Sequence, residues 1–205
     1  MHKIILSSIL IVSLFSACTP EPDTTANLAD TSNIAEKSNK PDTSTPADTI
    51  DEQETPVEKK DLEIGNSEHY ESDINIEAGD VNIGGNAVIK GSITIENGEL
   101  TIGNSTTVEG KIEIVNGNLS IGGNGQYKKD ITIVNGEFEA GHSNHFKDIT
   151  VEKGNLVIGG NNTIAGDLSA PNGKVDIENS NNISGDIISA DFKQGGNNTI
   201  SGSHP

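Results

Sequence analysis

The chain has 205 residues and a formal net charge of −18, with one cysteine and no tryptophan or arginine. Proteins bind nucleic acids and anionic membrane surfaces mainly through lysine and arginine. The strongly negative net charge therefore argues against both kinds of partner. A single cysteine excludes an internal disulfide framework. Only 3% of the residues are aromatic. A core of small aliphatic side chains suits a thin stacked coil better than a compact globule.

Residues 1–18 have the features of a secretory signal, in which Lys3 precedes an apolar run from Ile4 to Phe15 and then small residues. The segment ends in Leu14-Phe15-Ser16-Ala17-Cys18, which resembles the processing site of bacterial lipoproteins. The resemblance implies that Cys18 is lipidated, with palmitate among its acyl chains, and becomes the mature N-terminus. Because Thr19 rather than Asp follows, it also implies the outer membrane in an organism with two membranes. The alternative is an ordinary cleaved signal with an incidental cysteine.

Residues 19–61 form the second segment, which contains five of the seven prolines and no aromatic residue. Its low hydrophobicity and net negative charge leave too little apolar surface to offset the entropy lost on folding. The composition therefore predicts a disordered acidic tether between the signal and the rest of the chain.

Residues 62–205 repeat one pattern with a period of about 19 residues. Pairs of aliphatic residues separated by one position alternate with corners that contain glycine, often as Asn-Gly, which tolerates positive φ. The leading aliphatic residue of the first strand recurs at Ile74, Ile93, Ile112, Ile131, Ile149, Leu168 and Ile187, with a single step of 18 residues between Ile131 and Ile149.

Each repeat contains three short strands and three corners, and one repeat cannot bury its own apolar side chains. Stacked repeats can, so the sequence predicts an all-β fold, a single-stranded parallel β-helix (β-solenoid) of about eight turns. The alternative is an antiparallel sandwich or barrel, which would need hairpin loops of variable length rather than a nearly constant period.

The second corner alternates between two versions, so the underlying unit is a double turn of 38 residues. Every version needs a residue that tolerates positive φ, and stacked polar side chains can hydrogen-bond along the coil. We expect such a structural ladder at Asn86, Ser105, Asn124, Ser143, Asn161, Ser180 and Asn197.

Two segments carry a resemblance to the bactofilins, bacterial proteins that form polymers: Val108-Glu109-Gly110-Lys111-Ile112 and Ile183-Ser184-Gly185-Asp186-Ile187. The resemblance covers about residues 72–188 and implies a right-handed β-helix that self-associates. The Gly-Gly-Asn-Asn-Thr-Ile segments at 159–164 and 195–200 are also similar to exported, Asn-rich bacterial repeat proteins, a family that implies no activity.

The pair His142 and His145 is the one pattern typical of metal ligands, and Glu137 or Glu139 lies nearby in sequence. Glu139 is expected on the outside of its strand, so three converging ligands do not follow, and the sequence predicts no metal site. No turn carries the long loops or basic residues of a polysaccharide lyase. We therefore expect neither catalytic residues nor a cofactor.

Together these features predict a lipid-anchored structural or interaction protein of the cell envelope, without enzymatic activity. Its partners would be the membrane, through the lipid, and a second copy or an envelope protein or polysaccharide, but no nucleic acid. The exposed strand edges at the ends of a β-helix offer a route to self-assembly. The alternative is a β-helix that binds or degrades carbohydrate, for which the aromatic residues Tyr70, Tyr127, Phe138, Phe146 and Phe192 are all expected to point inward.

Overall fold

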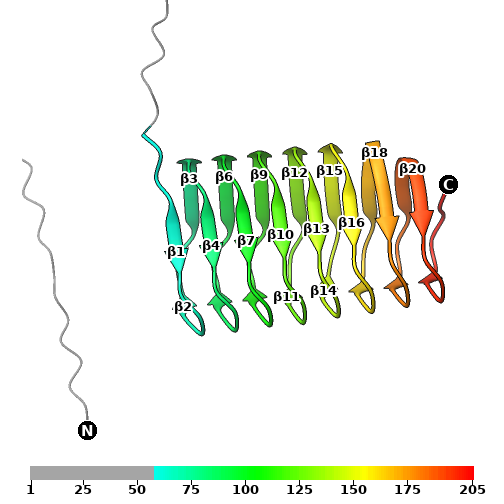
Figure 1. Ribbon diagram of the computed structural model, residues 1–205, viewed down its shortest axis with the longest axis horizontal. Coiled ribbons are helices and arrows are strands. Elements are labelled where there is room, and N and C mark those ends of the chain that lie inside the picture. The colour runs from blue at the N-terminus through cyan, green and yellow to red at the C-terminus, as the bar shows by residue number, and fades with distance from the viewer. Residues whose placement is uncertain (1–57) are drawn as a thin grey trace, which may run out of the picture. The chain divides into compact units, whose positions relative to one another are not determined.

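A computed structural model describes residues 58–205 of the chain (Figure 1). All regular structure in this part is β-strand, and the strands stack into one parallel coil. The signal, Cys18 and the tether as far as residue 57 lie outside the described residues. The backbone ladder of the coil already includes Lys60, whose N–H donates to the carbonyl oxygen of Ala78 at 2.7 Å.

Each turn contributes one strand to each of three faces. Face A is formed by β3 (Ile74–Ala78), β6 (Ile93–Asn97), β9 (Ile112–Asn116), β12 (Ile131–Asn135), β15 (Ile149–Lys153) and the first parts of β18 (Leu168–Ile177) and β20 (Ile187–Gln194). Face B is formed by β1 (Leu62–Ile64), β4 (Val81–Ile83), β7 (Leu100–Ile102), β10 (Leu119–Ile121), β13 (Phe138–Ala140), β16 (Leu156–Ile158) and the second parts of β18 and β20. Face C is formed by β2 (His69–Tyr70), β5 (Val88–Ile89), β8 (Thr107–Val108), β11 (Gln126–Tyr127), β14 (His145–Phe146), β17 (Thr163–Ile164), β19 (Asn182–Ile183) and β21 (Thr199–Ile200).

The three corners of a turn are named by the faces that they join, as the A–B, B–C and C–A corners. Equivalent strands of successive turns pair in parallel and in register, so that Ile93 lies beside Ile112 and Leu100 beside Leu119. Counted from β1, the coil has seven complete turns and a partial eighth. The predicted all-β parallel β-helix with a spacing of about 19 residues is confirmed.

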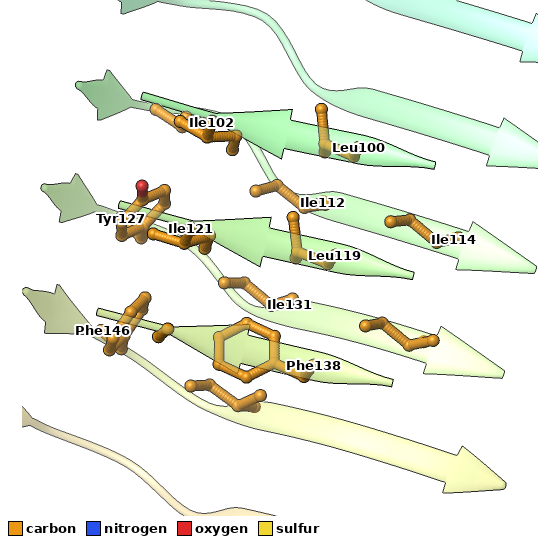
Figure 2. Packing of buried hydrophobic residues seen from close by; sticks show 14 of the residues in the cluster. Leu100, Ile102, Ile112, Ile114, Leu119, Ile121, Tyr127, Ile131, Phe138 and Phe146 are labelled. Atoms are coloured by element: carbon orange, nitrogen blue, oxygen red, sulfur yellow. The ribbon is translucent and has the colours of Figure 1, made fainter. Parts of the chain in front are cut away.

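The core is a set of aliphatic columns that run the length of the coil. Alternate strand residues point inward because successive side chains of a strand lie on opposite sides. Ile95, Leu100, Ile102 and Val108, on the consecutive strands β6, β7 and β8, are all buried, while Thr101 between two of them is exposed. Figure 2 shows how these columns stack from turn to turn. Full burial of one such side chain contributes roughly 1.5–3 kcal/mol to stability, so the columns provide the main driving force for folding.

An aromatic cluster replaces aliphatic residues in the fourth and fifth turns (Figure 2). The rings of Tyr127 and Phe146 stack with centroids 5.0 Å apart, and Phe138 meets Phe146 edge-on at 5.9 Å. Two small residues make room for these rings. Ala140 stands where neighbouring turns have isoleucine, and a Cβ added at Gly125 would lie 2.7 Å from the Tyr127 ring.

Glycine at the A–B corner is required because successive turns approach closely there. Gly98 has φ 154°, and a Cβ on it would lie 1.7 Å from the carbonyl oxygen of Gly79. The same contact recurs at Gly117 and Gly136. A side chain at any of these positions would force the stacked backbones apart, which is why the sequence repeats glycine with the period of the coil.

Two turns depart from the regular length. The missing residue of the 18-residue turn lies in the C–A corner between β14 and β15, where Phe146 and Ile149 are three positions apart. The deletion is therefore separate from the B–C corner that holds His142. In the last turn, β20 runs straight from face A into face B, and its pairing with β18 shifts register between Ala170 and Lys174.

Candidate functional site

The B–C corner carries the most regular set of polar residues in the coil. In each turn one non-glycine residue adopts a left-handed conformation with φ between 58° and 64°. These residues are Ser67, Asn86, Ser105, Asn124, Ser143, Asn161, Ser180 and Asn197. All seven positions expected from the sequence are among them, together with Ser67. Their left-handed conformation lies at the corner where the chain passes from face B to face C, and asparagine tolerates this conformation better than most residues do.

The side-chain hydrogen bonds of this corner come from the residues immediately before the left-handed ones. In the odd-numbered turns a side chain accepts a hydrogen bond from the backbone N–H of the glycine one turn later, at 2.6–2.8 Å. The four pairs are Asn66 with Gly85, Asn104 with Gly123, His142 with Gly160 and Asn179 with Gly196. We call these four acceptors the outer ladder.

The outer ladder explains the 38-residue double turn. The glycines that donate to it leave little space on their other side, because a Cβ on Gly123 would lie 2.9 Å from the carbonyl oxygen of His142. Equivalent distances at Gly85 and Gly160 are 3.1 and 3.0 Å. One turn therefore supplies a side chain that reaches forward, and the next supplies a glycine that accommodates it. This relationship produces a period of two turns.

A second ladder lies inside the coil, at the residues immediately after the left-handed ones. Asn144, Asn162 and Asn181 are buried, and Asn198 is partly buried. The Oδ1 atom of each accepts the backbone N–H one turn earlier, at 2.6–2.8 Å. Their Nδ2 groups donate to corner carbonyls such as that of Gly159, at 2.8 Å. We call these four residues the inner ladder; it satisfies backbone groups that water does not reach.

The sequence prediction therefore identified the corner, but the side-chain hydrogen bonds lie one residue to either side of the expected positions. The signal for the inner ladder was present as asparagine repeated at the same place in the last four turns. It was missed because the inward direction of these side chains depends on the backbone path around the corner, which the sequence pattern does not give.

The other two corners use the same kind of bond. At the A–B corner Asn116 donates to Asn97 and Asn135 donates to Asn116, at 3.1 and 3.0 Å. At the C–A corner aspartate carboxylates accept the backbone N–H of the following turn. Asp148 accepts from Asp167, Asp167 from Asp186, and Asp186 from Ser203, each at 2.7 Å. Backbone donation to Asp186 lowers the pKa of that carboxyl.

Surface ion pairs link neighbouring turns at the corners. Lys90 lies 2.8 Å from Glu71, and Lys128 lies 2.6 Å from Glu109. Asp176 faces both Lys174 and Lys193, and its hydrogen bond with Lys174 is the main reason why its pKa is lowered. These groups are largely exposed, so each pair contributes little to stability.

His142 and His145 serve different purposes. The Nδ1 atom of His142 accepts the Gly160 N–H at 2.8 Å, which places the imidazole proton on Nε2. The nearest carboxylate oxygen, Oε2 of Glu178, is 3.9 Å from Nδ1, and His145 is an exposed residue of β14. Among residues 58–205 no three His, Cys, Asp or Glu side chains gather in a group that could hold a metal ion.

The aromatic side chains of the described coil all belong to the core. Tyr127, Phe138 and Phe146 are buried, and Tyr70 and Phe192 are partly buried against the core at opposite ends. Their inward orientation agrees with the sequence prediction. An exposed row of aromatic residues, which many sugar-binding surfaces use, is not present in residues 58–205.

These features define the described part as a parallel β-solenoid whose corner side chains hydrogen-bond the backbones of adjacent turns. No helix within residues 58–205 has the length and apolar character needed to cross a membrane. Cys18, the expected lipidation site, lies outside the described residues. Comparison with known proteins found no match among family models, curated proteins or solved structures.

Proposed function

We propose that the protein is an exported, lipid-anchored rod of the cell envelope, without enzymatic activity, that joins copies of itself through the ends of its coil. The lipid is attached at Cys18, and the tether from residue 19 onward separates it from the coil. The observation that carries the proposal is the relationship between the first and last described turns.

The first described turn ends in a surface to which the partly buried side chains of Leu62 and Tyr70 contribute. Leu62, Tyr70, Ile74 and Ile76 line a hollow of about 260 Å³ at this end of the coil, together with the polar residues Lys60, Asp73 and Asn75. Within residues 58–205, strands β1, β2 and β3 pair with the second turn on one edge only. A strand edge with unpaired backbone groups is a template for another strand.

The opposite end presents the partner surface. Phe192 and Ile200 are only partly buried, and the ring of His204 packs edge-on against Phe192 with centroids 5.8 Å apart. Strands β20 and β21 likewise pair on one edge only within the described chain. An interface between two different ends of identical molecules is heterologous, so repetition leads to an open filament.

The alternation of turns is preserved across such a junction. The first turn carries the outer-ladder side chain Asn66, and the eighth carries the glycine Gly196. Inside the chain, a turn that supplies the donor glycine is always followed by a turn that supplies an outer-ladder side chain. For example, the turn with Gly85 is followed by the turn with Asn104. Stacking the first turn of one copy on the eighth turn of another reproduces this order. End-to-end joining in the opposite sense, with identical ends facing each other, does not.

Sedimentation velocity over a concentration series tests this proposal on the chain from residue 18 onward with Cys18→Ser, which prevents lipidation. We expect growing species and, in electron micrographs, filaments of constant width. Leu62→Lys adds a charge to the first turn and should abolish growth. The control Val157→Lys changes an exposed position on face B. A monomer at all concentrations, or growth that is unaffected by Leu62→Lys, would overturn end-to-end joining.

Mass spectrometry of the membrane fraction tests the anchor separately. The wild-type protein should begin at a Cys18 that carries acyl chains, and Cys18→Ser should be recovered without them. Recovery of an unmodified N-terminus from wild type would overturn the anchor and leave the assembly experiment unaffected.

A further inference from the structure

The irregular C–A corner creates a depression on the coil surface. Five of the other turns have glycine at this corner, and the first turn has Ser72. A Cβ on Gly110 would lie 2.3 Å from the carbonyl oxygen of Gly91. The fourth turn has Lys129 at that place, and the fifth turn lacks the residue altogether. The backbone opens slightly here, since the bond from Ile112 to Asp130 is 3.2 Å long, whereas the equivalent bond from Ile93 to Lys111 measures 2.9 Å.

The depression has a volume of about 380 Å³, within the range of roughly 300–1,000 Å³ that is usual for small-molecule sites. It is lined by Ser92, Gly110, Lys111, Glu113, Lys129, Asp130 and Thr132. It is open to solvent and lies along face A and the C–A corner, from the second to the fourth turn. It therefore admits part of a longer molecule as well as a small one.

The charges in this depression are not equivalent. Lys111 is already paired, because its Nζ lies 2.7 Å from Oε1 of Glu113. Lys129 is exposed and forms no ion pair within residues 58–205. Its ammonium group is therefore the one cation lining the depression that can pair with a ligand without breaking a bond of the coil. On a chain of net charge −18, this is a place where an anion meets a positive group.

The other lining groups are hydrogen-bonding side chains of the kind that bind hydroxyl groups. Ser92 and Thr132 supply hydroxyls, and the carboxylates of Glu113 and Asp130 accept hydrogen bonds. An ammonium beside two hydroxyls and two carboxylates matches a ligand that carries one carboxylate and several hydroxyls. We propose that this depression binds an acidic sugar, with Lys129 pairing with its carboxylate and Ser92, Thr132 and Asp130 bonding its hydroxyls.

This inference is independent of joining through the ends, because the depression lies on the side of the coil. It also needs no exposed aromatic platform, since charge and hydrogen bonds provide the recognition. Loss of a charge-assisted hydrogen bond weakens binding about tenfold or more.

Isothermal titration calorimetry of the Cys18→Ser chain, with digalacturonate as the probe, tests the proposal. We expect binding that weakens about tenfold in Lys129→Met. The control Lys153→Met removes another exposed lysine, which lies outside the depression and has no ion pair within residues 58–205. It should bind like wild type. Thr132→Val, which keeps the shape of the strand, should also weaken binding.

Two further probes separate the features of the ligand. Lactose has the hydroxyls without the carboxylate, and a diglutamate peptide has carboxylates without the sugar; both should bind at least about tenfold more weakly. Absence of digalacturonate binding to wild type would overturn the proposal. So would equal weakening by Lys129→Met and Lys153→Met, which indicates non-specific attraction, or equal affinity for diglutamate, which indicates a carboxylate site without sugar recognition.

Discussion

The Nδ1 atom of His142 lies 2.8 Å from the backbone nitrogen of Gly160, in the position that an asparagine Oδ1 occupies in the other three double turns. An imidazole can replace the amide because both present an acceptor at a similar distance from the backbone. His142, which a metal-binding interpretation would treat as a free ligand, is thus a member of the outer ladder. The contact between His142 and Gly160 also shows that the outer ladder requires a hydrogen-bond acceptor rather than one particular residue.

His142→Asn should therefore leave stability nearly unchanged, since asparagine restores the acceptor. His142→Ala removes the acceptor of the Gly160 N–H and should lower the free energy of unfolding by about 0.5–1.5 kcal/mol. Urea denaturation followed by circular dichroism measures both. His145→Ala is the control, because that exposed side chain should change stability by less than about 0.5 kcal/mol. A loss in His142→Asn as large as in His142→Ala would contradict the role of the outer ladder.

The glycines at the corners give a second prediction, in which two glycine-to-alanine changes differ in their effect on stability. Gly98→Ala places a Cβ 1.7 Å from the Gly79 carbonyl oxygen at φ 154°, so the turns must separate. The loss of stability should be well above about 1 kcal/mol. Gly196→Ala meets only the Oδ1 atom of Asn179, at 3.8 Å, which is ordinary contact. Thermal unfolding should show a large decrease in Tm for the first change and a small one for the second.

The inner ladder gives a third prediction. Asn162→Ala leaves the N–H of Asn144 and the carbonyl of Gly159 without their side-chain partner inside the coil. The carbonyl of Gly141 loses one of its two side-chain donors and keeps the Nδ2 group of Asn144, at 3.2 Å. Each unsatisfied buried group costs about 1–3 kcal/mol, so this change should be among the most destabilising at a polar position. The adjacent residue Asn161 provides the control. It is exposed with φ 60°, a conformation that glycine adopts readily, so Asn161→Gly should be nearly neutral. Equal losses from both changes in a chemical denaturation experiment would contradict the inner ladder.

The period and the core could be predicted from the sequence because they depend on properties that repeat. Alternating aliphatic residues fix which side of a strand is buried, and a constant spacing fixes the register of stacked turns. The predicted inward columns, such as Ile95 and Ile102, agree with the structure for this reason. The location of the 18-residue deletion also follows from spacing, since Ala140 and Phe146 keep the usual six positions.

The direction of polar corner side chains could not be predicted in the same way. Asn161 and Asn162 are identical neighbours, yet the first is exposed and the second is 1% exposed. The difference comes from the left-handed conformation of Asn161, which turns the next side chain inward. The depression beside Lys129 was missed too, because it requires the shapes of two turns to be compared and not only their lengths.

The last prediction concerns the hydroxyl of Tyr127, which is buried and has no hydrogen-bond partner among residues 58–205. Burial in the aromatic cluster raises the pKa of this hydroxyl above its usual value of 10.0. Below pH 10 the hydroxyl is neutral in both the folded and unfolded chain, so its ionisation does not reduce the free energy of unfolding. As the pH rises further, only the unfolded chain releases the proton, so stability falls through the alkaline range.

Tyr127→Phe removes the unsatisfied hydroxyl and keeps the ring that stacks on Phe146. The variant should be more stable than wild type by about 1 kcal/mol near neutral pH, because an unpaired polar atom no longer has to be buried. Its advantage should increase above pH 10, where the ionising tyrosine of the unfolded wild-type chain opposes folding. Urea denaturation at neutral and alkaline pH measures both effects. A variant less stable than wild type at neutral pH would show that the hydroxyl has a partner in solution. A difference that does not change with pH would show that the hydroxyl ionises as readily in the folded chain as in the unfolded one.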